Sequence, residues 1–245
     1  MNTNIDISVA DGSFSAYLAS PESGSGSKSG AGAADGVGRP ALIVLQEIFG
    51  VNAGIRGIAA DMAAHGFIVL CPDLFWRSER GLDMRESDPD HQERGFALYR
   101  AYDFESGVRD IAATAAAARA LPGCSGKVGV MGYCLGGLLA FLAATEGGIA
   151  DAAVAYYGGG TERFLARAPA LAAPLLMHLA EDDEYIGSEA QAAIHAALDW
   201  RAGVTIHAYP GQSHAFARPG GAHYEAASAL LANHRTLAFL RQHLQ

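Results

Sequence analysis

The sequence predicts an α/β protein in which a mostly parallel central sheet is covered by helices on both faces. Several short runs are predominantly apolar, which is typical of strands that are buried on both sides. These runs alternate with segments whose apolar residues recur at helical spacing, a pattern that indicates parallel strands joined by crossover helices. At 245 residues the chain can bury a large core within a single domain, and residues 1–245 show no internal repeat or second domain.

The expected elements begin with an N-terminal hairpin, because two alternating apolar stretches flank the turn signal Asp11-Gly12. Residues 22–39 are rich in glycine and serine and predict a flexible surface loop. Buried strands are expected at residues 41–46, 67–71 and 128–131, and further strands at 152–157, 174–179 and 204–209. Helices are expected at about 55–65, at 93–120 with a break near Asp103, from Leu135 onward, at 188–200 and at 222–243. Residues 77–92 are charged and predict a long surface excursion.

The composition excludes several classes of function. The formal net charge is −9 and no basic block stands out, so nucleic acid is not an expected partner. No apolar run approaches the ~18 residues that a membrane span needs, and the N-terminus lacks the pattern of a secretory signal. The cysteines, Cys71, Cys124 and Cys134, are too few for a disulfide framework. We therefore expect a cytoplasmic protein, and we take it to be a monomer.

The most informative motif is Gly-Tyr-Cys-Leu-Gly at residues 132–136, between an apolar strand and a helix. It stands where proteins of the α/β-hydrolase fold carry the G-x-S-x-G nucleophile elbow. That turn is so sharp that the nucleophile takes strained backbone angles and the residues two positions away must lack side chains. The alternative is a structural turn with a cysteine in the core. We favour Cys134 as the nucleophile, because the flanking glycines would otherwise have no evident purpose.

The base is expected after a later strand, since this fold orders nucleophile, acid and histidine along the chain. His214 alone lies in a glycine-containing loop just past the last expected strand, whereas His178 and His207 lie inside strands. A base is needed because a thiolate attacks an acyl carbon far faster than a thiol. The acid that orients the histidine should follow residues 174–179. Spacing leaves four candidates open there, namely Glu181, Asp182, Asp183 and Glu184.

An oxyanion hole is expected from two backbone N–H groups. One belongs to Leu135, the residue after the nucleophile, and the other to the segment Glu47-Ile48-Phe49 that follows an early strand. A carboxylate in that segment would lie near the elbow across the strand ends, although on the residues alone it could be an ordinary loop acid.

From about residue 41 to the C-terminus, the sequence resembles the dienelactone hydrolase (carboxymethylenebutenolidase) family. The matching segments are residues 46–52, 71–75, 129–137, 155–158 and 214–218. A cysteine elbow combined with the Gln-Glu-Ile-Phe-Gly segment is specific for this family among α/β-hydrolases. The resemblance implies opening of an enol-lactone, 4-carboxymethylenebut-2-en-4-olide, to maleylacetate, with no metal or organic cofactor.

The resemblance also implies roles for individual residues. It marks Cys134 as the nucleophile, Asp183 as the acid and His214 as the base. The backbone N–H groups of Ile48 and Leu135 would form the oxyanion hole. The substrate partner that it implies is a small lactone or ester, most naturally one that bears a carboxylate.

Other family features match only in part. The resemblance assigns Glu47 to hold the resting thiol neutral and to accept its proton once substrate displaces it. The family grips the substrate carboxylate with two arginines, one of which matches Arg218. The second falls at Gln92, where Arg94 is a candidate replacement, and a nearby family tyrosine appears as Phe96. Losing one charged hydrogen bond weakens carboxylate binding by about 1.5–3 kcal/mol, which leaves a less anionic lactone or ester as an alternative substrate.

Three aromatic residues are further candidates for the pocket. Phe49 is the strongest candidate of the three, because it belongs to the segment that carries the expected oxyanion donor. Trp76 and Tyr156 lie at the ends of expected strands on the side of the site, where core packing is the alternative.

The sequence therefore favours a cysteine hydrolase of lactones or activated esters. A carboxylesterase of broader specificity and an acyltransferase remain alternatives, because both share the acyl-enzyme. A non-catalytic, redox-sensing thiol protein is a further alternative. The joint presence of Glu47, Asp183 and His214 favours the enzyme, since a sensor would not require all three.

Overall fold

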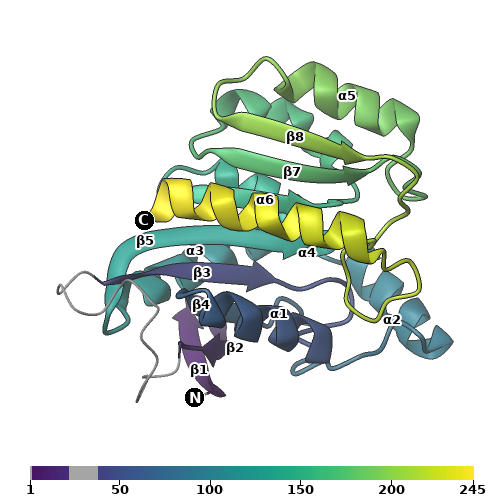
Figure 1. Ribbon diagram of the computed structural model, residues 1–245. Helices are drawn as coiled ribbons and strands as arrows, with labels where there is room; N and C mark the ends of the chain where they lie inside the picture. The colour runs from purple at the N-terminus through teal and green to yellow at the C-terminus, as the bar shows by residue number, and fades with distance from the viewer. Residues whose placement is uncertain (1, 22–37) are drawn as a thin grey trace.

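The computed structural model describes residues 2–21 and 38–245, so nearly all of the loop expected at 22–39 lies outside the described residues. Eight strands form one sheet in the order β1-β2-β4-β3-β5-β6-β7-β8 (Figure 1). They are β1 (Asn2–Val9), β2 (Gly12–Ala19), β3 (Arg39–Leu45), β4 (Ile68–Pro72), β5 (Cys124–Tyr133), β6 (Ala152–Tyr156), β7 (Leu175–Ala180) and β8 (Val204–Tyr209). Strands β4, β3, β5, β6, β7 and β8 pair in parallel, and the β1–β2 hairpin joins β4 antiparallel.

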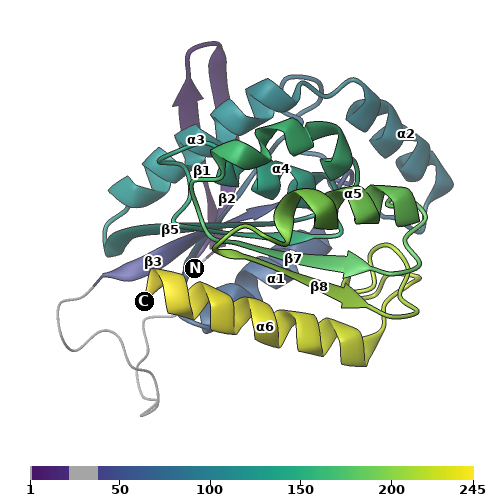
Figure 2. The same cartoon turned by 90° about the horizontal axis from the view of Figure 1, so that it is seen from above.

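Helices cover both faces of the sheet, as Figure 2 shows. One face carries α1 (Ala53–Ala64) and α6 (Ala226–Leu244). The other carries α3 (Phe104–Ala120), α4 (Leu135–Ala144) and α5 (Ser188–Leu198). α2 (Pro89–Arg100) lies beyond the ends of the strands, on the side toward which their arrowheads point (Figure 1). This mixed, mostly parallel sheet with helices on both faces confirms the predicted fold class.

The structure adds detail where the sequence pattern was ambiguous. The break expected near Asp103 is confirmed: α2 and α3 are separate helices, and Asp103 caps α3 by accepting hydrogen bonds from the backbone N–H groups of Glu105 and Ser106. A 3-10 segment, η1 (Thr161–Ala170), was not predicted from the sequence. It contains Pro169, which interrupts a helical pattern.

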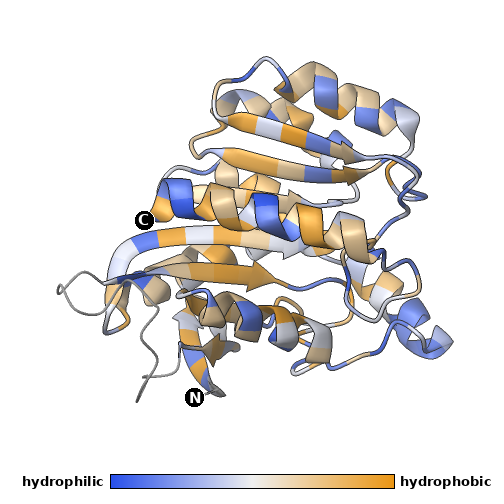
Figure 3. Ribbon diagram, in the orientation of Figure 1, coloured by the Kyte–Doolittle hydropathy of each residue, from blue (hydrophilic) through white to orange (hydrophobic). Residues whose placement is uncertain are grey.

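The core lies between the sheet and its helices. Every residue of β4, β6, β7 and α4 is buried, which explains why these segments are predominantly apolar. In Figure 3 the strands are predominantly orange, whereas the outer end of α2 is blue. Full burial of α4 fixes the turn that precedes it. No helix in the described part of the chain is long and apolar enough to cross a membrane.

Candidate active site

The turn between β5 and α4 has the geometry of a nucleophile elbow. Cys134 caps α4 with φ 54° and ψ −113°, angles that non-glycine residues rarely adopt. A Cβ on Gly132 would lie 2.2 Å from the carbonyl oxygen of Gly136, and one on Gly136 would lie 2.5 Å from that of Leu45. Both positions therefore need glycine, as the motif predicted. This sharp turn places the Cys134 side chain at the end of the sheet.

His214 and Asp183 meet beside this elbow, although they follow different strands. Nδ1 of His214 lies 2.9 and 3.0 Å from the two carboxylate oxygens of Asp183. The carboxylate is fixed in turn by the backbone N–H groups of Tyr185 (2.8 Å) and Ile186 (3.1 Å), which donate to its Oδ1. Of the four acids left open by spacing, Asp183 is the one whose carboxylate contacts the imidazole. Glu184 instead accepts a hydrogen bond from the backbone N–H of His214 (3.1 Å).

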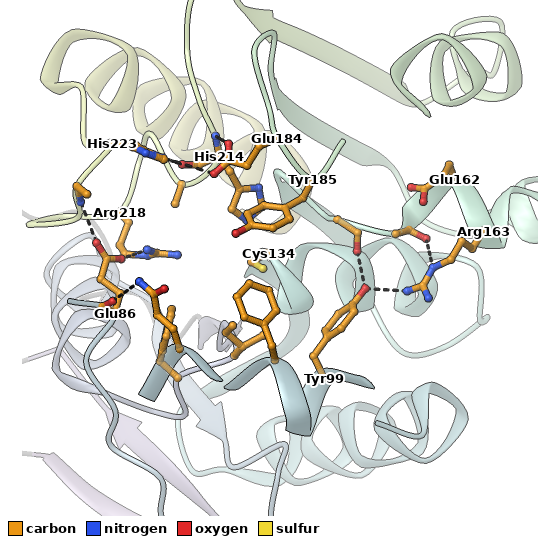
Figure 4. A pocket seen from close by; sticks show the side chains of 18 residues that line it. Glu86, Tyr99, Cys134, Glu162, Arg163, Glu184, Tyr185, His214, Arg218 and His223 are labelled. Atoms are coloured by element: carbon orange, nitrogen blue, oxygen red, sulfur yellow. Dashed lines mark hydrogen bonds and ion pairs between the residues drawn. The ribbon is translucent and has the colours of Figure 1, made fainter. Parts of the chain in front are cut away.

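The electrostatics of His214 favour the charged ring. Burial alone would lower its pKa, but the charge of Cys134 and the hydrogen bond to Asp183 outweigh burial and hold the pKa well above its usual value. Nε2 of the ring is buried and falls short of a full hydrogen bond in this geometry. Cys134 is nevertheless close enough for its charge to raise the pKa of His214, and Figure 4 shows the two side chains facing the same cavity. The arrangement suits an imidazolium beside a thiolate.

Two backbone N–H groups near Cys134 are available for a ligand oxygen. Leu135 is the first residue of α4, where the backbone N–H has no partner within the helix. Ile48 lies in the segment after β3 and lines the same cavity as Cys134. Within the described residues, neither N–H donates to a protein acceptor. The side chain of Leu135 is fully buried, so only its backbone can reach a ligand.

The cavity in front of Cys134 has a volume of about 390 Å³ (Figure 4). Its walls combine aromatic and aliphatic side chains with a few charged groups, as is usual for small-molecule sites. The lining residues are Ile48, Phe49, Glu86, Gln92, Phe96, Tyr99, Cys134, Gly159, Gly160, Glu162, Arg163, Glu184, Tyr185, His214, Ala215, Arg218, Ala222 and His223.

Arg218 lies between two carboxylates at one end of this cavity. Its Nε and Nη2 donate to the two oxygens of Glu47, at 2.5 and 2.8 Å. Its Nη1 is paired with Glu86. The guanidinium also lies over the ring of Phe49, 5.3 Å from the centroid. Glu47 is 4% exposed and borders a smaller, adjacent cavity rather than the one that holds Cys134.

The chain is similar to known proteins in both sequence and fold. The profile of the dienelactone hydrolase family matches residues 30–244. The chain belongs to that family. A candidate carboxymethylenebutenolidase of Azospirillum brasilense is 42% identical, covering 98% of this chain and 99% of its own length. Carboxymethylenebutenolidase 1 of Cupriavidus pinatubonensis is 35% identical, covering 95% and 93%. The crystal structure of a candidate dienelactone hydrolase from Klebsiella pneumoniae superposes with a TM-score of 0.83 at 26% identity, covering 99% and 98%.

The structure places Glu47 differently from the position that the dienelactone hydrolase family resemblance implied. Both of its oxygens bind Arg218, and within the described residues it makes no hydrogen bond to Cys134. For Glu47 to accept a proton from the thiol, its carboxylate would have to exchange Arg218 for sulfur. In the present arrangement the thiol faces His214 instead.

Arg94 does not replace the second arginine of the dienelactone hydrolase family. It points away from the cavity and pairs with Glu79 on the surface. Gln92, two residues earlier in α2, lines the cavity instead. Two positions along a helix correspond to about 200° of rotation, so the two side chains leave opposite sides of α2.

Trp76 and Tyr156 were wrongly expected to line the pocket. Trp76 stacks on Phe14 of the N-terminal hairpin, and its indole N–H donates to Asp110 (2.9 Å). Tyr156 is fully buried, and its hydroxyl lies 2.7 Å from the hydroxyl of Thr236 in α6. Both residues belong to the packing of the fold. Phe49 and Arg218 do line the cavity, as expected.

Sequence reasoning missed several residues of the cavity. Tyr185 packs edge-on against the ring of His214, with centroids 4.8 Å apart. At the far end, Tyr99 donates to the carbonyl of Gly159 (3.1 Å) and accepts from Arg163 (2.7 Å). Glu86 belongs to the charged excursion, which carried no motif. Only Tyr185 had a usable signal, because it follows the acid loop directly. No group of three or more potential metal-binding side chains is present in residues 2–21 and 38–245.

Proposed function

We propose that the protein hydrolyses lactones or activated carboxylic esters through an acyl-enzyme on Cys134. The observation that carries the proposal is that Cys134 and His214 line the same cavity while Asp183 binds Nδ1 of His214, although the three residues follow three separate strands. Membership in the dienelactone hydrolase family supports an enol-lactone ring as the type of group that is opened.

In the proposed first half-reaction, the Cys134 thiolate attacks the lactone carbonyl carbon. The oxygen of the tetrahedral intermediate accepts hydrogen bonds from the backbone N–H groups of Ile48 and Leu135. The ring C–O bond then breaks, which leaves a thioester on the sulfur of Cys134. His214 protonates the leaving enolate oxygen, and the resulting enol tautomerises to a ketone. Asp183 holds the ring in the tautomer that directs Nε2 at the reacting atoms.

In the second half-reaction, water attacks the thioester. Neutral His214 takes the proton of the water, the same two N–H groups bind the oxyanion, and sulfur leaves as thiolate. The charged imidazole stabilises that thiolate, which accords with the raised pKa of His214. The lactone has then gained one water and opened to a keto acid, and the enzyme has returned to its starting state.

The direct test is turnover of dienelactone and of p-nitrophenyl acetate by purified protein. Cys134→Ala is expected to reduce both rates to background, because no other cysteine is among the described residues that line the cavity. Cys124→Ala is the matched control, since Cys124 lies at the start of β5, outside the residues that line the cavity. Wild-type turnover in Cys134→Ala would show that the proposal is wrong. Trapping of an acyl group on Cys134 by mass spectrometry would identify the intermediate.

A further inference from the structure

Arg218 is the only arginine at its end of the cavity among the described lining residues, and internal carboxylates already engage its donors. Nε and Nη2 bind Glu47, and Nη1 binds Glu86. We propose that Glu86 occupies the position on Arg218 that a substrate carboxylate would take, so that the enzyme selects uncharged lactones and esters. This inference rests on the proposed hydrolysis and names its substrate class.

Glu86 is held in place from two directions. The backbone N–H of Ala222 donates to its Oε1 at 2.8 Å. The side-chain amide of Gln92 donates to its backbone carbonyl at 2.6 Å. Its side chain is 18% exposed, and that of Arg218 is 20% exposed. A substrate carboxylate would therefore have to displace a carboxylate that is tethered within the chain and is favoured by its high effective concentration.

The charge balance of Arg218 also disfavours an anion. One guanidinium faces the carboxylates of Glu47 and Glu86, so this end carries a net negative charge. An incoming carboxylate would bring a third negative charge into a partly buried site, where Coulomb repulsion is weakly screened.

The opposite end of the cavity offers no clear alternative for an anion. Arg163 donates to the hydroxyl of Tyr99 and to the carbonyl of Gly160, and Glu162 lines the cavity beside it. Glu184 adds another carboxylate near His214. The remaining walls are largely aromatic and aliphatic, which favours an uncharged acyl or ring group.

The test compares dienelactone, which carries a carboxylate, with its methyl ester, which presents the same ring without the charge. Ring opening is followed by chromatography of the products, and each kcat/KM is divided by the rate constant for alkaline hydrolysis of the same compound. The wild type is expected to favour the methyl ester. Glu86→Gln is expected to raise the ratio of anionic to neutral kcat/KM about tenfold, because it frees one charged donor of Arg218.

Glu79→Gln is the matched control. Glu79 also pairs with an arginine, Arg94, but this pair lies outside the lining of the cavity. Glu79→Gln removes the same charge as Glu86→Gln and should leave the ratio of anionic to neutral kcat/KM unchanged. A wild type that favours the anionic lactone, or a Glu86→Gln ratio within twofold of wild type, would overturn the inference while the proposed hydrolysis stands. No turnover of either compound would overturn the proposed hydrolysis and this inference with it.

Discussion

Two histidines are buried near the carboxyl ends of neighbouring strands, and their electrostatics are opposite. His178 in β7 is fully buried, with Nδ1 2.8 Å from the hydroxyl of Tyr209 and Nε2 2.9 Å from that of Thr236. Both hydrogen-bond partners are neutral, so burial dominates and, together with the charges of His207 and Arg235, lowers the pKa of His178 well below its usual value. His214 is 4% exposed, yet its pKa is raised.

The difference comes from the partners rather than from burial. His214 faces the Asp183 carboxylate and Cys134, and both favour the protonated ring. Burial makes each of these interactions stronger, because water no longer screens them. A low dielectric therefore enlarges the pKa shift that neighbouring charged groups cause. His178 serves as an internal reference for a buried imidazole that has no carboxylate or cysteine partner.

The largest expected effect comes from removing the charge next to His214. Asp183→Asn keeps the size of the side chain but no longer fixes the productive tautomer or stabilises the imidazolium, so kcat should fall by about 10²–10⁴. Steady-state kinetics on dienelactone or p-nitrophenyl acetate would measure this. Asp182→Asn is the control, since Asp182 is exposed and does not contact His214. Equal losses in the two variants would contradict the proposed role of Asp183.

The contrast also shows what the sequence could and could not predict. Cys134 and His214 could be located because each has a local signature, a strained turn flanked by glycines and a loop after the last strand. His178 could be assigned to the core because it lies inside an apolar strand. Asp183 needed coordinates or family resemblance, since four acids share the loop and only the backbone path decides which one reaches the ring.

The error at Tyr156 has a physical cause. Tyr156 is the last residue of β6 and Tyr157 follows it, and successive side chains along a strand point to opposite faces. Tyr157 packs against His214, with centroids 5.0 Å apart, whereas Tyr156 points to Thr236 in α6. Position at a strand end predicts nearness to the site but not the direction of the side chain. The pairing of Glu86 with Arg218 was equally inaccessible, because no sequence pattern links the two segments.

The next effect concerns stability rather than activity. His178→Leu removes two buried hydrogen bonds and a ring that packs on Tyr156, with centroids 4.4 Å apart. The free energy of unfolding should fall by about 2–3 kcal/mol, and kcat should stay within a few-fold of wild type. Urea denaturation and kinetics at neutral pH would separate the two. His207→Leu, at the paired position of the edge strand β8, should cost less, because His207 is only partly buried. A large loss of kcat in His178→Leu at unchanged stability would contradict the assignment of His178 to the core and of His214 to catalysis.

The smallest expected effect is the pH dependence of stability, which should have opposite signs for the two histidines. The pKa of His178 is lowered on folding. Below about pH 6.5 this histidine is therefore protonated in the unfolded chain but stays neutral in the folded chain. This costs about 1 kcal/mol of stability between pH 6.5 and 5.5, a loss that His178→Leu should remove.

The pKa of His214 is raised on folding, so its contribution is fully present below about pH 6.5 and is lost as the pH rises through the folded pKa. His214→Gln should therefore flatten the alkaline side of the stability profile, whereas His178→Leu flattens the acid side. Urea denaturation of the wild type and both variants from pH 5 to 9 would measure this. If both variants changed the same side, the partners would not set the sign, and the two histidines would differ only in position.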